Sequence, residues 1–217
     1  MEEIIGKLSR LIIELPIFIV AIAIHEFSHV LAADLLGDKT GREMGRLTLN
    51  PLSHIDWFGL FMLVIAHFGW GNPAPVNPSR FKNVSEKVGM AIVAVSGPLS
   101  NIILAIIGLY GLKLFGILHS SNIIEVDPSS IVSWFYIFIY INIMLFVFNL
   151  IPIPPLDGSR VVRLFLIGET LRKFDEFEKY GIIILMIILF IPFTNEILSD
   201  GLKVVIKLCF NLLLFLP

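Results

Sequence analysis

The first long apolar run of the chain, from about Leu11 to Leu36, contains three ionisable side chains in a defined pattern. They are His25, Glu26 and His29, in the sequence His-Glu-x-x-His. On a helix, residues four apart lie on one face, so both imidazoles can bind one zinc ion beside the intervening carboxylate. Ionisable groups are costly in hydrocarbon and face a protein-lined cavity. The run therefore predicts a membrane helix with a hydrolytic site for one Zn2+ per chain, in which Glu26 is the general base.

Composition favours a membrane protein over a soluble one. Of the 217 residues, 56% are hydrophobic and 16% are charged, whereas about 25% are charged in soluble domains. This length predicts a single membrane-embedded domain, 1–217, with a catalytic core at about 11–170 and accessory helices at about 178–217. The net charge of -2 argues against a nucleic-acid partner. The single cysteine, Cys209, excludes an internal disulfide and a cysteine-ligated zinc site.

Further apolar runs predict the other membrane segments. Two runs, at about 87–118 and 131–150, are long enough to cross a bilayer. Two shorter runs follow at 180–193 and 202–216. Between the two pairs, the mixed and basic stretch 159–177 predicts an interfacial helix.

The region after the first span predicts a different kind of element. Residues 46–50 (Arg-Leu-Thr-Leu-Asn) alternate with period two, which indicates a short strand. The apolar stretch 57–68 is too short to cross a bilayer directly and indicates a re-entrant segment. The expected fold is an α-helical polytopic membrane protein with about five to six membrane segments and a small strand or re-entrant element after the first helix.

The distribution of Lys and Arg predicts the orientation. The regions 37–87 and 157–179 are rich in both residues, whereas the loop 118–130 has neither. The positive-inside rule places the two basic regions in the cytoplasm. The protein is then expected to be a multi-pass protein of the cell membrane, with its metal motif toward the cytoplasmic side.

A catalytic zinc site needs a third protein ligand and one open position. The candidate is Asp157, which follows the third long span in the sequence Ile-Pro-Ile-Pro-Pro-Leu-Asp-Gly. Prolines at this place break the helix, and irregular backbone is tolerated at membrane depth where it lines a cavity. The alternative is that Asp157 caps the next helix. In that case the third ligand lies elsewhere, with His54 the next candidate and His67 a further histidine in the same part of the chain.

Taken together, these motifs resemble the site-2 protease family of intramembrane zinc metalloproteases, in its compact subgroup without a PDZ domain. The resemblance rests on the His-Glu-x-x-His helix and on the segment 149–158, Asn-Leu-Ile-Pro-Ile-Pro-Pro-Leu-Asp-Gly. Residues 45–56 and 96–101 (Ser-Gly-Pro-Leu-Ser-Asn) are also similar to that subgroup.

The resemblance implies that the two histidines and Asp157 ligate zinc and that Glu26 is the base. It also implies that Asn101 and Asn149 face the site, where an amide can hold a substrate backbone or a developing oxyanion. The alternative for both asparagines is hydrogen bonding between membrane helices.

The implied function is that of an intramembrane zinc metalloendopeptidase, which cleaves transmembrane protein substrates in or near their membrane segments. Two other classes remain open: a catalytically inactive membrane scaffold, and a membrane metal-binding or transport protein. The intact Glu26 argues against the scaffold. The scarcity of ionisable residues in the other spans argues against transport.

Overall fold

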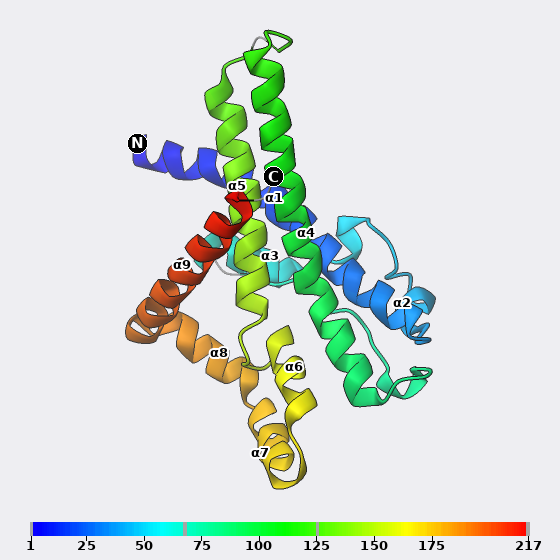
Figure 1. Cartoon of the computed structure of the whole chain (residues 1–217). Helices are drawn as coiled ribbons and strands as arrows, with labels where there is room; N and C mark the ends of the chain where they lie inside the picture. Colours follow the sequence, from blue (N-terminus) through cyan, green and yellow to red (C-terminus); the bar gives the residue numbers. More distant parts are fainter. Residues whose placement is uncertain (1, 67–68, 125, 216–217) are drawn as a thin grey trace.

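The computed structural model describes residues 2–66, 69–124 and 126–215 (Figure 1). In this part of the chain, helices are joined by short irregular segments and two single 3-10 turns. The elements, in chain order, are α1 (Glu2–Leu35), α2 (Thr40–Glu43), η1 (Pro51–Ser53), α3 (Trp57–Ala66), η2 (Pro78–Arg80), α4 (Glu86–Ser120), α5 (Pro128–Asn149), α6 (Asp157–Phe165), α7 (Gly168–Glu178), α8 (Gly181–Phe190) and α9 (Pro192–Leu214).

Three of the described helices are long and apolar enough to cross a membrane. They are the Leu11–Leu35 part of α1, α4 and α5, and they confirm the three long spans expected from the sequence. The two later segments form α8 and α9. Helix α8 has 10 residues, which at 1.5 Å per residue span about half of a ~30 Å hydrocarbon layer. Helix α9 is continuous, but its sequence includes the charged residues Glu196, Asp200, Lys203 and Lys207. The structure therefore does not confirm the expected five to six membrane segments.

The strand expected at 46–50 is not confirmed either. These residues are irregular, and the only strand-like pairing among the described residues is an isolated bridge between Ile55 and Gly71. Side chains take the backbone bonds that a strand would use: Thr48 Oγ1 accepts from the N–H of Asn50, and Asn50 Oδ1 accepts from the N–H of Leu52. Such local bonds favour turns over sheet pairing. The apolar stretch 57–68 forms the short helix α3, with 67–68 outside the described residues.

The single interfacial helix expected at 159–177 is two helices, α6 and α7. Helix α6 ends at Phe165, and α7 begins at Gly168. Gly168 has a φ of 56°, in the left-handed region that glycine adopts without steric cost. The chain therefore turns at this glycine, and the two short helices follow different directions (Figure 1).

Helices α4 and α5 form an antiparallel pair at the centre of the molecule, and α1 crosses behind them (Figure 1). Glycines on α4 bring the pair close: a Cβ at Gly108 would lie 2.7 Å from Phe138 Cδ1, and one at Gly111 would lie 2.7 Å from Phe135 Cε1. Small residues at such contacts are typical of membrane helices. Helix α9 adds Ile206 to the core that α4 and α5 share.

The outer face of α4 is apolar. Ile107, Leu114 and Ile117 expose 59%, 56% and 62% of their surface. In water, a continuous apolar surface of this kind favours association, whereas lipid chains solvate it. The exposed apolar side chains therefore agree with a membrane-spanning role for this helix.

The C-terminal end of α1 is fixed by buried carboxylates. Asp34 accepts two bonds from the guanidinium of Arg42, at 2.8 Å each, and one from Lys39 at 3.0 Å. Asp38 accepts a bond of 2.6 Å from the backbone N–H of Asn77. This last contact fastens residues 71–77, here called the strap, along α1.

Candidate metal centre

Three potential metal ligands converge at the place where α1 meets the start of α6. His25 Nε2 and His29 Nε2 lie 3.0 Å apart. Oδ2 of Asp157 lies 3.2 Å from the first nitrogen and 3.3 Å from the second. Among the described residues, these three form the one group of His, Cys, Asp or Glu side chains close enough to hold a metal ion together. The structure thus brings together the residues that the two sequence motifs supply.

The other nitrogen of each imidazole is bonded to an oxygen atom. His25 Nδ1 lies 2.7 Å from Oδ1 of Asn101, and His29 Nδ1 lies 2.7 Å from the carbonyl oxygen of Val93. A carbonyl oxygen only accepts, so each Nδ1 carries the proton and donates it. In the neutral ring, Nε2 of both histidines then holds a lone pair directed at the same point.

Three acceptors that face one another require a cation between them. Oδ2 of Asp157 is buried and has no hydrogen-bond partner, although a buried acceptor without a partner costs free energy. A proton can fill this place in the metal-free protein, and a metal ion can replace it. Zinc bonds of about 2.0–2.1 Å at tetrahedral angles separate their donors by about 3.3–3.4 Å. The observed triangle is close to that size, so these residues fit zinc with one coordination position open.

The carboxylate of Asp157 is suited to bind a cation. Asp157 is the first residue of α6 and makes no capping bond there, since Leu156 occupies the cap position without a side-chain bond. The following residue is tightly packed: a Cβ at Gly158 would lie 2.2 Å from the carbonyl oxygen of Leu150. The structure therefore favours the ligand role for Asp157 over the cap.

Helix α4 presents one face to the two histidines. Val93, Gly97 and Asn101 are spaced by four residues, so they form a stripe along the helix. Val93 and Asn101 bond the two imidazoles, and Gly97 lies between them. A Cβ at Gly97 would lie 2.4 Å from His29 Nε2 and 2.7 Å from His25 Cε1. Only a residue without a side chain leaves room for the site.

The carboxylate of Glu26 lies beside the strap. Its Oε2 accepts a bond of 2.8 Å from the backbone N–H of Ala74. The close approach depends on glycine, because a Cβ at Gly71 would lie 2.8 Å from Ile22 Cγ2 and 3.5 Å from Glu26 Cγ. Further along the strap, Arg46 donates to the carbonyl oxygen of Asn72 at 2.6 Å. The strap thus holds the expected base in one orientation, on the helix that carries both histidines.

The remaining expected residues lie at different distances from the centre. Asn101 is fully buried and contacts the site through His25, with its amide engaged by protein groups. Asn149 is half-buried at the end of α5, where its Nδ2 donates to Leu145 O. His54 is fully buried outside the triangle and bonds the carbonyl oxygen of Thr48. His67 lies outside the described residues.

Two contributors to the centre were not expected from the sequence. Asn142 on α5 is fully buried and accepts a bond from Nδ2 of Asn101 at 3.1 Å. The second is the backbone N–H of Ala74. A signal for Asn142 does exist, because an amide in an apolar span needs a partner and this one lies two helical turns before Asn149. A backbone donor such as that of Ala74 has no sequence signal.

A buried cation-binding triangle in a helical membrane protein is what the structure defines, and the comparisons with known proteins agree. The sequence model of peptidase family M50 matches residues 113–192, which include Asp157. "Putative zinc metalloprotease YwhC" of Bacillus subtilis is 36% identical over 180 residues, which cover 83% of this chain and 81% of that protein. "Putative zinc metalloprotease Rip2" of Mycolicibacterium smegmatis is 30% identical over 186 residues, with 82% and 67% covered. No solved structure gave a significant match.

The chain therefore belongs to peptidase family M50. The resemblance to the compact site-2 proteases is thereby confirmed. The family match ends where α9 begins and does not reach the His-Glu-x-x-His helix, but the alignments to the relatives span more than four fifths of this chain.

Proposed function

We propose that this protein is an intramembrane zinc metalloendopeptidase that cleaves peptide bonds in or near the transmembrane segments of other membrane proteins, as in regulated intramembrane proteolysis. Family M50 membership makes it a zinc metalloprotease. The observation that carries the proposal is the convergence of three acceptor atoms within 3.3 Å of one another, two from the apolar helix α1 and one from the start of α6. The carboxylate of Glu26, which is not part of the triangle, lies on the same helix as the two histidines.

In this proposal the chain's own residues divide the work. His25, His29 and Asp157 hold the metal, which when bound polarises the scissile carbonyl and acidifies water. Glu26, one residue from His25, accepts the proton of the attacking water and returns it to the leaving amine. The strap N–H of Ala74 keeps the Glu26 carboxylate in place. Asn149, which is half-buried, is the asparagine we assign to the substrate backbone.

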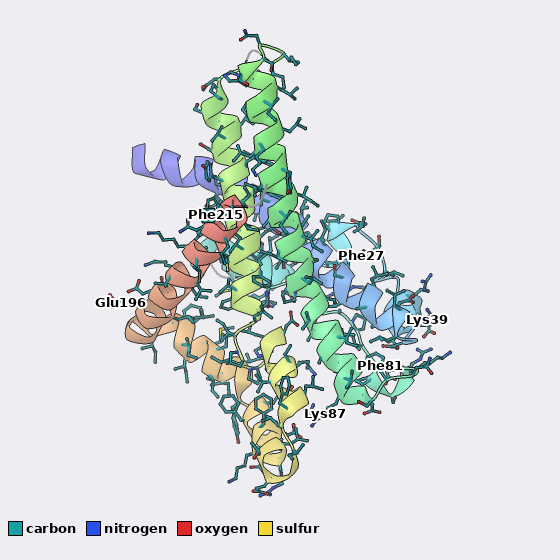
Figure 2. The ribbon with its side chains drawn as sticks, viewed as in Figure 1. Phe27, Lys39, Phe81, Lys87, Glu196 and Phe215 are labelled. Atoms are coloured by element: carbon teal, nitrogen blue, oxygen red, sulfur yellow. The ribbon has the colours of Figure 1, made fainter. Side chains whose placement is uncertain are left out.

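We further place the whole chain in one membrane domain, with residues 11–170 as the catalytic core and the later helices as accessory elements. The metal centre lies toward the cytoplasmic side of the cell membrane. Lys39 and Lys87 lie on one side of the molecule, away from the tip of the α4–α5 hairpin (Figure 2). That distribution supports the orientation, because basic residues collect on the cytoplasmic face.

Replacement of the base tests the activity. Glu26→Gln keeps the size of the side chain but removes its basicity, so cleavage of single-span peptides by purified protein should fall by about 100-fold or more. Zinc content should stay at one per chain, because the ligands are intact. Glu169→Gln on the exposed face of α7 is the matched control and should cleave normally. Loss of zinc from Glu26→Gln would show that Glu26 is a ligand and would contradict the assignment.

Cysteine labelling tests the orientation. On a Cys209→Ser background, a cysteine at Lys173 should react with an impermeant reagent only from the cytoplasmic side. A cysteine at Asn122, in the loop between α4 and α5, should react only from the other side. The reverse pattern would contradict the proposed topology, while leaving the metal chemistry untouched.

A further inference from the structure

A continuous chain of amide hydrogen bonds leads from α5 through α4 to the metal centre. Nδ2 of Asn142 donates to the carbonyl oxygen of Phe138 at 2.9 Å. Its Oδ1 accepts from Nδ2 of Asn101 at 3.1 Å. The Oδ1 of Asn101 in turn accepts from Nδ1 of His25 at 2.7 Å. Both asparagines are 0% exposed, so water cannot substitute for any of these partners.

The chain has one direction, and its far end sets that direction. The carbonyl of Phe138 can only accept, so the NH2 group of Asn142 must face it and the oxygen of Asn142 must face Asn101. Asn101 then turns its NH2 group toward Asn142 and its oxygen toward His25. His25 therefore carries its proton on Nδ1, and Nε2 keeps the lone pair that a metal needs.

We infer that Asn142 is a positioning residue for the metal: it fixes the amide of Asn101, and through it the tautomer and ring orientation of His25. The inference rests on the proposed zinc site. Neither sequence motif contains Asn142, and it touches no ligand directly. It lies on α5, and the chain that follows α5 leads through residues 150–156 to Asp157 at the start of α6.

Without Asn142, the orientation of the Asn101 amide is less strongly fixed. The NH2 group of Asn101 keeps one other acceptor, the carbonyl oxygen of Ala21, at the longer distance of 3.3 Å. A flipped Asn101 would present its NH2 group to His25, and the imidazole would respond by placing its proton on Nε2, where it competes with zinc. Partners of this kind are worth about 10- to 100-fold in metal affinity. We expect a partial loss of affinity because the Ala21 carbonyl still favours the native orientation.

The test is the zinc affinity of full-length variants in detergent, measured by competition with a chromophoric chelator. Asn142→Leu should lower the affinity about 10- to 100-fold. Asn142→Asp keeps an acceptor oxygen toward Asn101 and should bind zinc nearly as well as the wild type. Ile143→Ala is the control for packing, since Ile143 is the next residue, is 0% exposed and belongs to the core. It should lower thermal stability and leave the zinc affinity unchanged.

A double-mutant cycle separates positioning from general damage. If Asn142 acts through Asn101, then Asn142→Leu should have little further effect on zinc affinity in an Asn101→Leu background. Equal losses in Asn142→Leu and Ile143→Ala, additive losses in the cycle, or an unchanged affinity in Asn142→Leu would each overturn the inference.

A measurement on the wild type covers the case in which Asn142→Leu does not fold. With 15N-labelled histidine and bound zinc, the Nδ1–H of His25 should give a hydrogen-bonded, exchange-protected proton signal. Its absence would overturn the inference. The test also separates this inference from the proposed function. Wild-type protein that binds zinc but cleaves no peptide would contradict the function alone. Wild-type protein that cleaves peptides, together with an unchanged zinc affinity in Asn142→Leu, would contradict the inference alone.

Discussion

Asp38 and Asp157 each place a buried carboxylate oxygen beyond the end of a membrane helix, but the two oxygens have opposite surroundings. Asp38 is 1% exposed and accepts bonds from the side chain and backbone of Thr40 and from the N–H of Asn77. Oδ2 of Asp157 has no donor and faces two imidazole nitrogens. Hydrogen-bond donors of the protein satisfy the carboxylate of Asp38. Oδ2 of Asp157 is satisfied only when a cation is present.

The difference distinguishes a structural acid from a binding acid. Asp34, like Asp38, is matched within the fold, because Arg42 grips both of its oxygens and Lys39 adds a third bond. Burial by itself therefore does not mark a functional carboxylate in this protein. A functional carboxylate is identified here by the convergence of several acceptors on one point. Keeping these acceptors together costs folding free energy, which metal binding offsets.

Replacing each carboxylate by the corresponding amide tests most strongly whether Asp157 binds metal while Asp38 is structural. Asp157→Asn removes the charge that faces the cation, so zinc affinity should fall by more than the ~100-fold upper range of an outer partner. Asp38→Asn should keep the zinc affinity of the wild type. It should instead lower the free energy of unfolding by about 1–3 kcal/mol, since a charged acceptor is lost from a buried set of donors. Chelator competition and thermal unfolding measure the two effects.

Each variant serves as the control for the other. Normal zinc binding in Asp157→Asn would show that Asp157 caps α6 and that another residue is the third zinc ligand. Loss of zinc in Asp38→Asn would show that the strap and the metal centre depend on each other more than their separate contacts indicate.

Two glycines on α4 allow the same kind of comparison for the space around the metal ligands, because Gly97 lies beside the histidines and Gly116 does not. Gly97→Ala places a methyl group 2.4 Å from His29 Nε2, whereas Gly116→Ala meets nothing within 4 Å. We expect Gly97→Ala to lower zinc affinity by about 10-fold or more, as misplaced ligand partners do, and Gly116→Ala to bind as the wild type does. Metal titration of both variants checks this, and equal affinities would mean that the histidines can move away from α4 freely.

The smallest expected effect is a pH dependence of stability. Burial would raise the pKa of Asp38, but the bonds from Thr40 and Asn77 lower it below its usual 3.8. The stabilisation is therefore present above pH 3.8 and is lost as the pH falls from there through the lower folded-state pKa. The difference in unfolding free energy between wild type and Asp38→Asn should shrink over that range. A difference that grows with acidity would contradict the role of Asp38.

Much of the centre was predictable because it depends on local spacing. His25 and His29 share a face by helical geometry alone. The need for a third ligand makes Asp157 a candidate, and the resemblance to the site-2 protease family is what implies the ligand role over the helix cap. The three long spans were predictable from length and apolarity. Each of these features depends on a few residues close in the sequence and not on tertiary contacts.

The remaining features depend on tertiary contacts that spacing does not encode. The alternation at 46–50 predicts a strand, but no neighbouring strand exists to pair with it among the described residues, and Thr48 and Asn50 bond the local backbone instead. The role of Asn142 requires knowing that α4 and α5 are antiparallel and in register at Asn101. The contact of Ala74 with Glu26 requires knowing the path of the strap.

X-ray absorption at the zinc edge on the purified wild type tests the central claim most directly. The account predicts one zinc per chain, with two imidazole nitrogens and carboxylate or water oxygens at about 2.0–2.2 Å. The signal should lose intensity in Asp157→Asn and persist in Asp38→Asn. A spectrum without two imidazoles, or with a sulfur ligand at about 2.3 Å contributed by Cys209, would contradict the assignment of His25, His29 and Asp157 as the metal site.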